Sequence, residues 1–147
     1  MSIPEDVLIV RVDPAARLPE RANPGDAGWD LFSIEAVRLE PGARHAVRTG
    51  LAIAMPPGLV ALIHARSGRA RREGLALVNA PGVVDAGYRG EITVVVVNLD
   101  PRDPITIAPG DRIAQVLFQR VSSIRWHEVE ALPGTHRGSA GFGSSGQ

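Results

Sequence analysis

Hydrophobic positions in this sequence come in short runs rich in Val, Ile and Leu, and no long segment follows a helical period. Gly and Pro, often adjacent, separate nearly all of these runs. Many short strands at such spacing indicate an all-β sandwich, jelly roll or barrel. The expected strands are Val7–Val12, Val37–Leu39, His45–Arg48, Leu51–Met55, Leu59–His64, Ala76–Val78, Ile92–Asn98, Ile105–Ile107 and Ile113–Gln119.

Two segments depart from this pattern. The one helix that we predict is short, Ser67–Glu73, with Ser67 as its N-cap. The run from Ile92 to Val97 does not alternate with polar residues, so both faces of that strand should be buried. Its second face could meet a partner subunit, or the strand could be an ordinary central one covered on both sides, and the run alone leaves both alternatives open.

The C-terminal end is rich in Gly and Ser and has too few apolar residues to fold alone. We therefore predict a β-domain over residues 1–133 and a mobile arm over residues 134–147. The arm carries one cation, Arg137, and one aromatic residue, Phe142. A frayed tail is the usual interpretation, but this pair also fits an arm that closes over an anion and a flat base.

Composition narrows the possible chemistry. The 147 residues hold 16 basic and 16 acidic side chains, a balance that argues against binding to nucleic acid or membranes through net charge. All the basic residues are arginine, which excludes lysine-based catalysis, and the chain has no Cys, which excludes disulfides, thiolate nucleophiles and Cys-ligated zinc. Neither a signal peptide nor a membrane-spanning run is present in the sequence, so a cytoplasmic location is the default expectation.

Several segments combine glycine with polar side chains. Residues 141–146 match the dinucleotide-binding pattern GxGxxG, but that pattern needs a strand before it and a helix after it, and a single residue follows it in this sequence, so we interpret the match as composition. Four further segments are residues 24–31, 65–68, 79–91 and 110–115. Each one alone is more simply a structural turn.

Taken in order, these four segments and residues 137–146 resemble the five motifs of the trimeric dUTP pyrophosphatase (dUTPase) family, and the resemblance covers nearly the whole chain. It implies a distorted jelly roll or β-barrel of the β-clip type. It also implies a homotrimer with shared active sites, in which the arm of one chain closes a site formed by the other two. The implied reaction is Mg²⁺-dependent hydrolysis of dUTP to dUMP and pyrophosphate, which keeps uracil out of DNA and supplies dUMP for thymidylate synthesis.

The resemblance also assigns roles to single residues. Asp85 would hold the water that attacks the α-phosphorus, and Asp30 would contact the hydration shell of a Mg²⁺ held mainly by the triphosphate. The expected substrate-binding residues are Arg66, Ser67, Gly68, Asn79, Gly82, Tyr88, Gln115, Arg137, Phe142, Gly143 and Ser144. The structural alternatives are a buried Asp85 that caps the Asp85–Tyr88 turn, a strand-edge aromatic at Tyr88, a turn carboxylate at Asp30 and a strand-end amide at Gln115.

Three positions depart from the family pattern: Ala65 replaces a common Pro, Arg69 a common apolar residue, and Ala140 a usual Gly. We also expect residues 71–73 to form a solvated helix face, and Asp111 and Arg112 to fix the turn before a strand rather than to contact substrate. The four histidines show no metal-ligand spacing.

Two rival functions remain. A dCTP deaminase shares the fold, but its family needs a glutamate in the strand after the third motif, where this chain reads Thr-Val-Val-Val-Val. A regulatory protein that binds dUTP without turnover is the second alternative.

Overall fold

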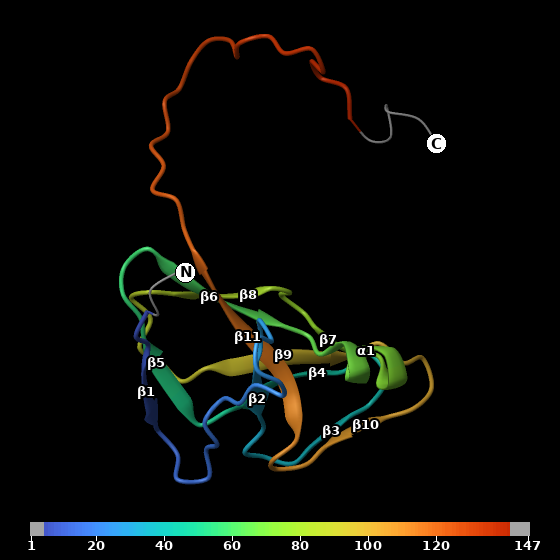
Figure 1. Ribbon diagram of the computed structural model, residues 1–147. Helices are drawn as coiled ribbons and strands as arrows, with labels where there is room; N and C mark the ends of the chain where they lie inside the picture. The colour runs from blue at the N-terminus through green and yellow to red at the C-terminus, as the bar shows by residue number, and fades with distance from the viewer. Residues whose placement is uncertain (1–4, 142–147) are drawn as a thin grey trace.

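The structure is a computed structural model that describes residues 5–141, and it confirms the all-β prediction (Figure 1). Between these residues it has eleven strands and one helix. The strands are β1 Leu8–Arg11, β2 Trp29–Phe32, β3 Val37–Leu39, β4 Arg44–Arg48, β5 Leu51–Ala54, β6 Leu59–His64, β7 Leu75–Leu77, β8 Gly82–Asp85, β9 Thr93–Asn98, β10 Ile105–Ile107 and β11 Arg112–Arg120, and the helix is α1 Ser67–Glu73.

All the strand pairs are antiparallel. One sheet has the order β2-β11-β6-β8, a second has the order β4-β9-β7, and β1-β5 and β3-β10 form two-stranded ribbons. The longest strand, β11, lies between β2 and β6 and crosses the molecule diagonally in Figure 1. Because β2, β6 and β8 all belong to this one sheet, it positions most of the predicted site residues.

Two of the strands, β2 and β8, were not predicted from the sequence. Both lie in glycine-rich segments whose local composition favours turns. They form strands because β11 and β6 supply their partners: Asp30 pairs with Gln115, and Gly82 pairs with Ile63. Pairing across the sheet therefore overrides local preference here.

Helix α1 occupies the predicted range, but the prediction that Ser67 caps it is wrong. The N-cap is Arg66, whose backbone is extended (φ −93°, ψ 125°), and no side chain caps the helix there. Gly74 ends the helix with φ 72°, a left-handed conformation that glycine adopts without steric cost. Its amide donates a hydrogen bond to the Ala70 carbonyl at 3.0 Å.

The valine run lies in strand β9, and within one chain only one of its two faces is fully buried. Val94 and Val96 are 1% and 0% exposed and belong to the core, whereas Val95 and Val97 on the other face are only half-buried. Although β9 lies between β4 and β7, the single chain covers one face and leaves the second partly open.

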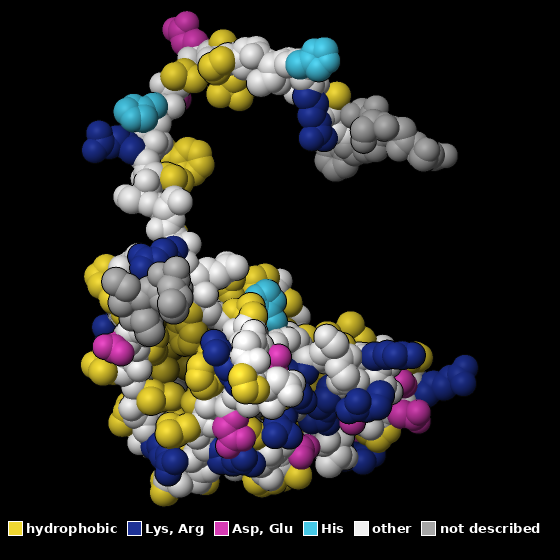
Figure 2. Space-filling model, in the orientation of Figure 1, with side chains coloured by type: hydrophobic (Ala, Val, Ile, Leu, Met, Phe, Trp, Pro, Cys, Tyr) yellow, Lys and Arg dark blue, Asp and Glu magenta, His cyan; other side chains and the backbone are white. Residues whose placement is uncertain are grey.

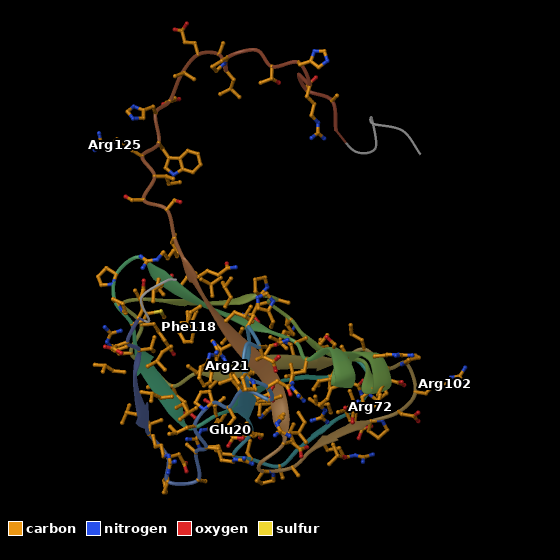
Figure 3. All side chains as sticks on the ribbon, in the orientation of Figure 1. Glu20, Arg21, Arg72, Arg102, Phe118 and Arg125 are labelled. Atoms are coloured by element: carbon orange, nitrogen blue, oxygen red, sulfur yellow. The ribbon has the colours of Figure 1, made fainter. Side chains whose placement is uncertain are left out.

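Beyond Arg120 the chain leaves the barrel. Residues 121–140 are exposed, and Figure 1 shows this segment following a wide path away from the sheets. Trp126 and Leu132 are 89% and 86% exposed, and Arg125 projects from the same stretch (Figure 3). The domain boundary at residue 134 stays a prediction.

In the part of the chain described by the structure, no helix has the length and apolar character needed to cross a membrane.

Candidate active site

The segment of residues 79–91, called the hairpin below although its strand β8 pairs with β6, presents Asp85 on an exposed turn. Asp85 ends β8, and its backbone carbonyl accepts a hydrogen bond from the Tyr88 amide at 3.0 Å. The Asp85 side chain is exposed, and its carboxylate has no hydrogen-bond or ion-pair partner among residues 5–141. The alternative of a buried carboxylate that caps the turn is therefore wrong, because the backbone closes the turn.

Tyr88 lies directly over Gly90. A Cβ atom at residue 90 would come within 2.3 Å of the Tyr88 hydroxyl oxygen and 2.6 Å of its Cζ. The hydroxyl donates a hydrogen bond to the Glu91 carbonyl at 3.1 Å, yet 47% of Tyr88 stays exposed. Tyr88 and Asp85 line the same small cavity of about 170 Å³. One hydrogen bond thus holds the ring over Gly90, where it lines the same cavity as Asp85.

Glu91 fixes the base of this hairpin, a role that no sequence pattern indicated. Its Oε1 accepts the Gly50 amide at 2.8 Å, and its Oε2 accepts Arg48 Nε at 3.2 Å. The hydrogen bond and charge of Glu91 raise the pKa of Arg48 above its ordinary value. Next to it, the Thr49 hydroxyl donates to the Ile92 carbonyl at 2.6 Å. The hairpin is therefore anchored to the β4–β5 turn, about forty residues earlier in the sequence.

Asn79 and Gly82 lie at the opposite end of β8 from Asp85. Gly82 is buried and pairs with Ile63 of β6, and a Cβ at residue 82 would lie 3.3 Å from the Ile63 Cβ. The exposed Asn79 places its Nδ2 within 3.5 Å of the same position. Glycine therefore lets the β8 backbone, the Asn79 amide and β6 approach closely.

A second group of predicted residues surrounds Asp30 on β2. Asp30 is 7% exposed, and its Oδ1 accepts Arg66 Nε at 2.8 Å. Its Oδ2 lies 3.1 Å from Arg112 Nε and 3.4 Å from Arg66 Nη2. The two arginines compensate the charge of this buried carboxylate. Arg112 thus binds a predicted site residue in addition to beginning β11, a contact that the sequence did not reveal.

Gln115 joins this second group through its side chain. Its Nε2 donates to the Ala65 carbonyl at 2.9 Å, and a Cβ at Gly28 would come within 2.2 Å of its Oε1. The departure at residue 65 does not affect this contact, because the acceptor is a backbone carbonyl. Because Gln115 approaches so closely, a side chain at residue 28 would have to displace the Gln115 amide. The structure therefore brings Asp30, Arg66 and Gln115 together.

Ser67 and Gly68 begin α1 beside this group. Arg72, labelled in Figure 3, lies on the same helix with its Nη1 3.0 Å from the position of a Cβ on Gly68. Arg71 and Arg72 are exposed, as expected for a solvated face. The expectation is wrong for Glu73, which is half-buried and pairs with Arg69.

Within one chain the two groups are separated. Asp85 pairs with Val60 at the start of β6, whereas Arg66 follows the end of β6 at His64. Four residues of strand at about 3.3 Å each place these two ends roughly 13 Å apart, and Arg66 lies further along the chain. One copy therefore does not bring Asp85 next to Arg66 and Gln115.

The arm contributes one predicted residue that the structure describes. Arg137 is exposed, and its Nε donates to the Ala140 carbonyl at 2.9 Å. The Ala140 amide donates back to the Arg137 carbonyl at 3.2 Å, and Gly138 between them has φ 56°. The other predicted arm residues, Phe142, Gly143 and Ser144, lie outside the described residues.

Another hollow in the surface has a volume of about 850 Å³, and none of the predicted site residues lines it. Its walls are mostly apolar and include Ile9, Leu18, Trp29 and Phe118. Hydrophobic side chains gather on that side of the barrel, and arginines gather toward the α1 side (Figure 2).

Residues 5–141 contain no group of three His, Cys, Asp or Glu side chains that could hold a metal ion alone. Asp30 is the candidate carboxylate, and a carboxylate has about four lone-pair sites, of which the two hydrogen bonds from Arg66 use two. This donor set suits a cation that is bound mainly by a ligand and contacted through water, rather than one held in a protein cage.

Comparison with known proteins identifies the family. The sequence matches the family model described as dUTPase over residues 15–146. The chain belongs to the dUTPase family.

Relatives and solved structures of dUTPases extend this result over nearly the whole chain. A deoxyuridine 5'-triphosphate nucleotidohydrolase of Mycobacterium avium is 58% identical over 95% of this chain and 94% of its own length. The corresponding protein of Corynebacterium diphtheriae is 57% identical over 97% and 94%.

Among structures, the dUTPase of Staphylococcus bacteriophage 80alpha with dUpNHpp superposes with a TM-score of 0.89 at 30% identity, covering 97% of this chain and 99% of the phage chain. A mutant dUTPase from phage phi11 of S. aureus, in which a structural Mg(II) ion is coordinated, gives a TM-score of 0.79 at 27% identity over 88% and 99%. The predicted family and jelly-roll fold are confirmed.

Proposed function

We propose that this chain hydrolyses dUTP to dUMP and pyrophosphate, with the Asp85 carboxylate orienting the attacking water. Family membership supports the reaction, and the observation that carries the residue assignment is the exposed, unengaged carboxylate of Asp85 beside Tyr88. The water oxygen forms a bond to the α-phosphorus while the bond from that phosphorus to the bridging oxygen of the β-phosphate breaks. The proton of the water passes to Asp85, and pyrophosphate leaves.

The hairpin would select the base and the sugar. Asn79 and the backbone around Gly82 present donors and acceptors to the uracil edge, and their close packing against β6 restricts the space available. Cytosine reverses the polarity of one exocyclic group and would leave buried groups unpaired, which can cost roughly 10⁴-fold in specificity. The Tyr88 ring, held over Gly90, packs against the deoxyribose and excludes a 2′-hydroxyl.

The second group would bind the phosphates. Arg66, the Ser67 hydroxyl, Gly68 and Gln115 lie around one point of the sheet, and an arginine fork suits phosphate oxygens. Asp30 orients Arg66 and retains capacity for a metal-bound water. Bound Mg²⁺ would neutralise part of the triphosphate charge and so make pyrophosphate a better leaving group.

A homotrimer would join the two groups. Since one chain separates Asp85 from Arg66 along β6, a complete site needs the hairpin of one copy and the phosphate-binding group of another. A partner would also cover the half-buried face of β9 at Val95 and Val97. The arm of a third copy, residues 134–147, would bring Arg137 to the terminal phosphate and Phe142 onto the uracil, with Gly143 and Ser144 at the phosphates.

Neither rival function explains the site as well. Deamination lacks its glutamate, because β9 reads Thr-Val-Val-Val-Val-Asn. A protein that only senses dUTP would have no use for an unengaged carboxylate next to the sugar-binding tyrosine.

The test compares wild type with Asp85→Asn on dUTP, dCTP, dTTP and UTP, with and without Mg²⁺, and measures pyrophosphate release and dUpNHpp affinity. We expect wild type to release pyrophosphate from dUTP but not from the other three nucleotides, and to lose this activity when Mg²⁺ is removed. Asp85→Asn should lose about 10³-fold in turnover while its affinity for dUpNHpp stays unchanged. Near-wild-type turnover of Asp85→Asn would refute its role. Ammonia release from dCTP would instead support the deaminase, and dUpNHpp binding by a wild type that releases no pyrophosphate would support the sensor.

A further inference from the structure

Arg69 is a buried arginine for which the proposed reaction has no role. It is 8% exposed, although arginine is rarely this buried unless it is paired. Its position in helix α1 is one residue after Gly68, so it lies next to the proposed phosphate-binding residues. It is also one of the three positions that depart from the family pattern.

The Arg69 guanidinium contacts three separate parts of the chain. Its Nε and Nη2 donate to the two Glu73 carboxylate oxygens at 2.6 and 3.3 Å, within the same helix. Nη2 also donates to the Thr106 carbonyl of β10 at 3.0 Å, and Nη1 lies 3.5 Å from Asp111 Oδ2. Because Asp111 immediately precedes β11, this one side chain ties α1 to the start of β11.

Three contacts therefore connect residues 65–69 with residues 111–115. Gln115 donates to the Ala65 carbonyl, Asp30 bridges Arg66 and Arg112, and Arg69 reaches Asp111. A seven-residue helix is marginal by itself, so tertiary contacts must determine its position. Of these three contacts, the one made by Arg69 is the only one whose side chain belongs to the helix.

We propose that Arg69 is a positioning residue for the triphosphate. By holding α1 against β10 and the start of β11, it keeps the Arg66 guanidinium and the Ser67 hydroxyl in register with the Gln115 amide. This inference rests on the proposed phosphate-binding role of Arg66. It predicts that Arg69 affects ligands with a β,γ-diphosphate more than ligands without one.

The experiment measures the dissociation constants of dUpNHpp and dUMP for wild type, Arg69→Leu and Arg69→Lys, with thermal unfolding as a separate readout. We expect Arg69→Leu to weaken dUpNHpp binding about tenfold and dUMP binding less than twofold, since dUMP lacks the two outer phosphates. Arg69→Lys keeps the charge but loses the planar fork, so it should recover part of the loss.

Asp111→Asn provides a milder variant, because asparagine can still accept the Ala108 amide hydrogen bond (3.0 Å) that Asp111 accepts. It should show the same selective loss, about two- to fivefold, and add little to Arg69→Leu in a double-mutant cycle. Equal changes for both ligands, or a shift in unfolding temperature alone, would overturn the positioning role. Arg66→Ala is the control for the proposed function: if it does not weaken dUpNHpp binding, the phosphate-binding group itself is wrong.

Discussion

Replacing Gly90 with alanine tests whether the orientation of Tyr88 matters for the reaction. The new Cβ would lie 2.3 Å from the Tyr88 hydroxyl oxygen, whereas ordinary contacts begin near 3.4 Å. The ring must therefore retreat by about 1 Å, which breaks its 3.1 Å hydrogen bond to the Glu91 carbonyl. Gly87→Ala is a matched control in the same turn, because nothing lies within 4 Å of a Cβ at residue 87.

The cost to folding should be small. Tyr88 is 47% exposed, so its side chain can swing outward, and the lost hydrogen bond amounts to about 1 kcal/mol. The cost to catalysis should be larger, since a misplacement of about 1 Å at a substrate contact can reduce the rate roughly 10²-fold. We also expect the preference for dUTP over UTP to fall, because the ring no longer closes the space beside the sugar.

The assay compares kcat/KM for dUTP and UTP in wild type, Gly90→Ala and Gly87→Ala, and follows urea unfolding of each. Gly87→Ala should match wild type in both measurements. If Gly90→Ala keeps the wild-type kcat/KM for both nucleotides, the position of the Tyr88 ring does not determine sugar selection.

Three other positions lead to further predictions. Gly28→Ala should push the flexible end of Gln115 aside, which lowers the free energy of unfolding by about 1 kcal/mol. It should also weaken dUpNHpp binding as much as Gln115→Ala does, and a wild-type affinity for dUpNHpp would contradict this. Arg137→Ala should cut turnover strongly while size-exclusion chromatography shows an intact oligomer, and an unchanged rate would remove the arm from the mechanism. Hydrogen bonds from backbone amides, chiefly that of Asp103, lower the pKa of Asp100 below its ordinary value of 3.8. The ionised Asp100 carboxylate therefore stabilises the fold above pH 3.8, and this contribution is lost as the pH falls through the lowered pKa. Acid unfolding of Asp100→Asn should therefore converge with wild type at low pH, and a constant difference would refute it.

Local patterns in the sequence were sufficient for most of the fold. Strands β6 and β10 occupy the predicted ranges, because their apolar runs are bounded by turn residues. Helix α1 also occupies its predicted range, although it has no apolar run. The glycine-rich strands β2 and β8 were missed, since their extended conformation depends on pairing with β11 and β6. The order and spacing of five motifs also identified the family, although each motif alone is more simply a structural turn.

The sequence by itself thus determined the fold class, the family and which residues to examine. Only the tertiary structure decided how those residues are grouped, since charge pairing and strand register join positions far apart in the chain. It paired Arg69 with Asp111, Asp30 with two arginines, and Glu91 with the turn at Gly50. It also separated Asp85 from Arg66 along one strand. Long-range contacts of this kind produce no periodic pattern in the sequence, and the sequence does not distinguish a buried arginine from an exposed one.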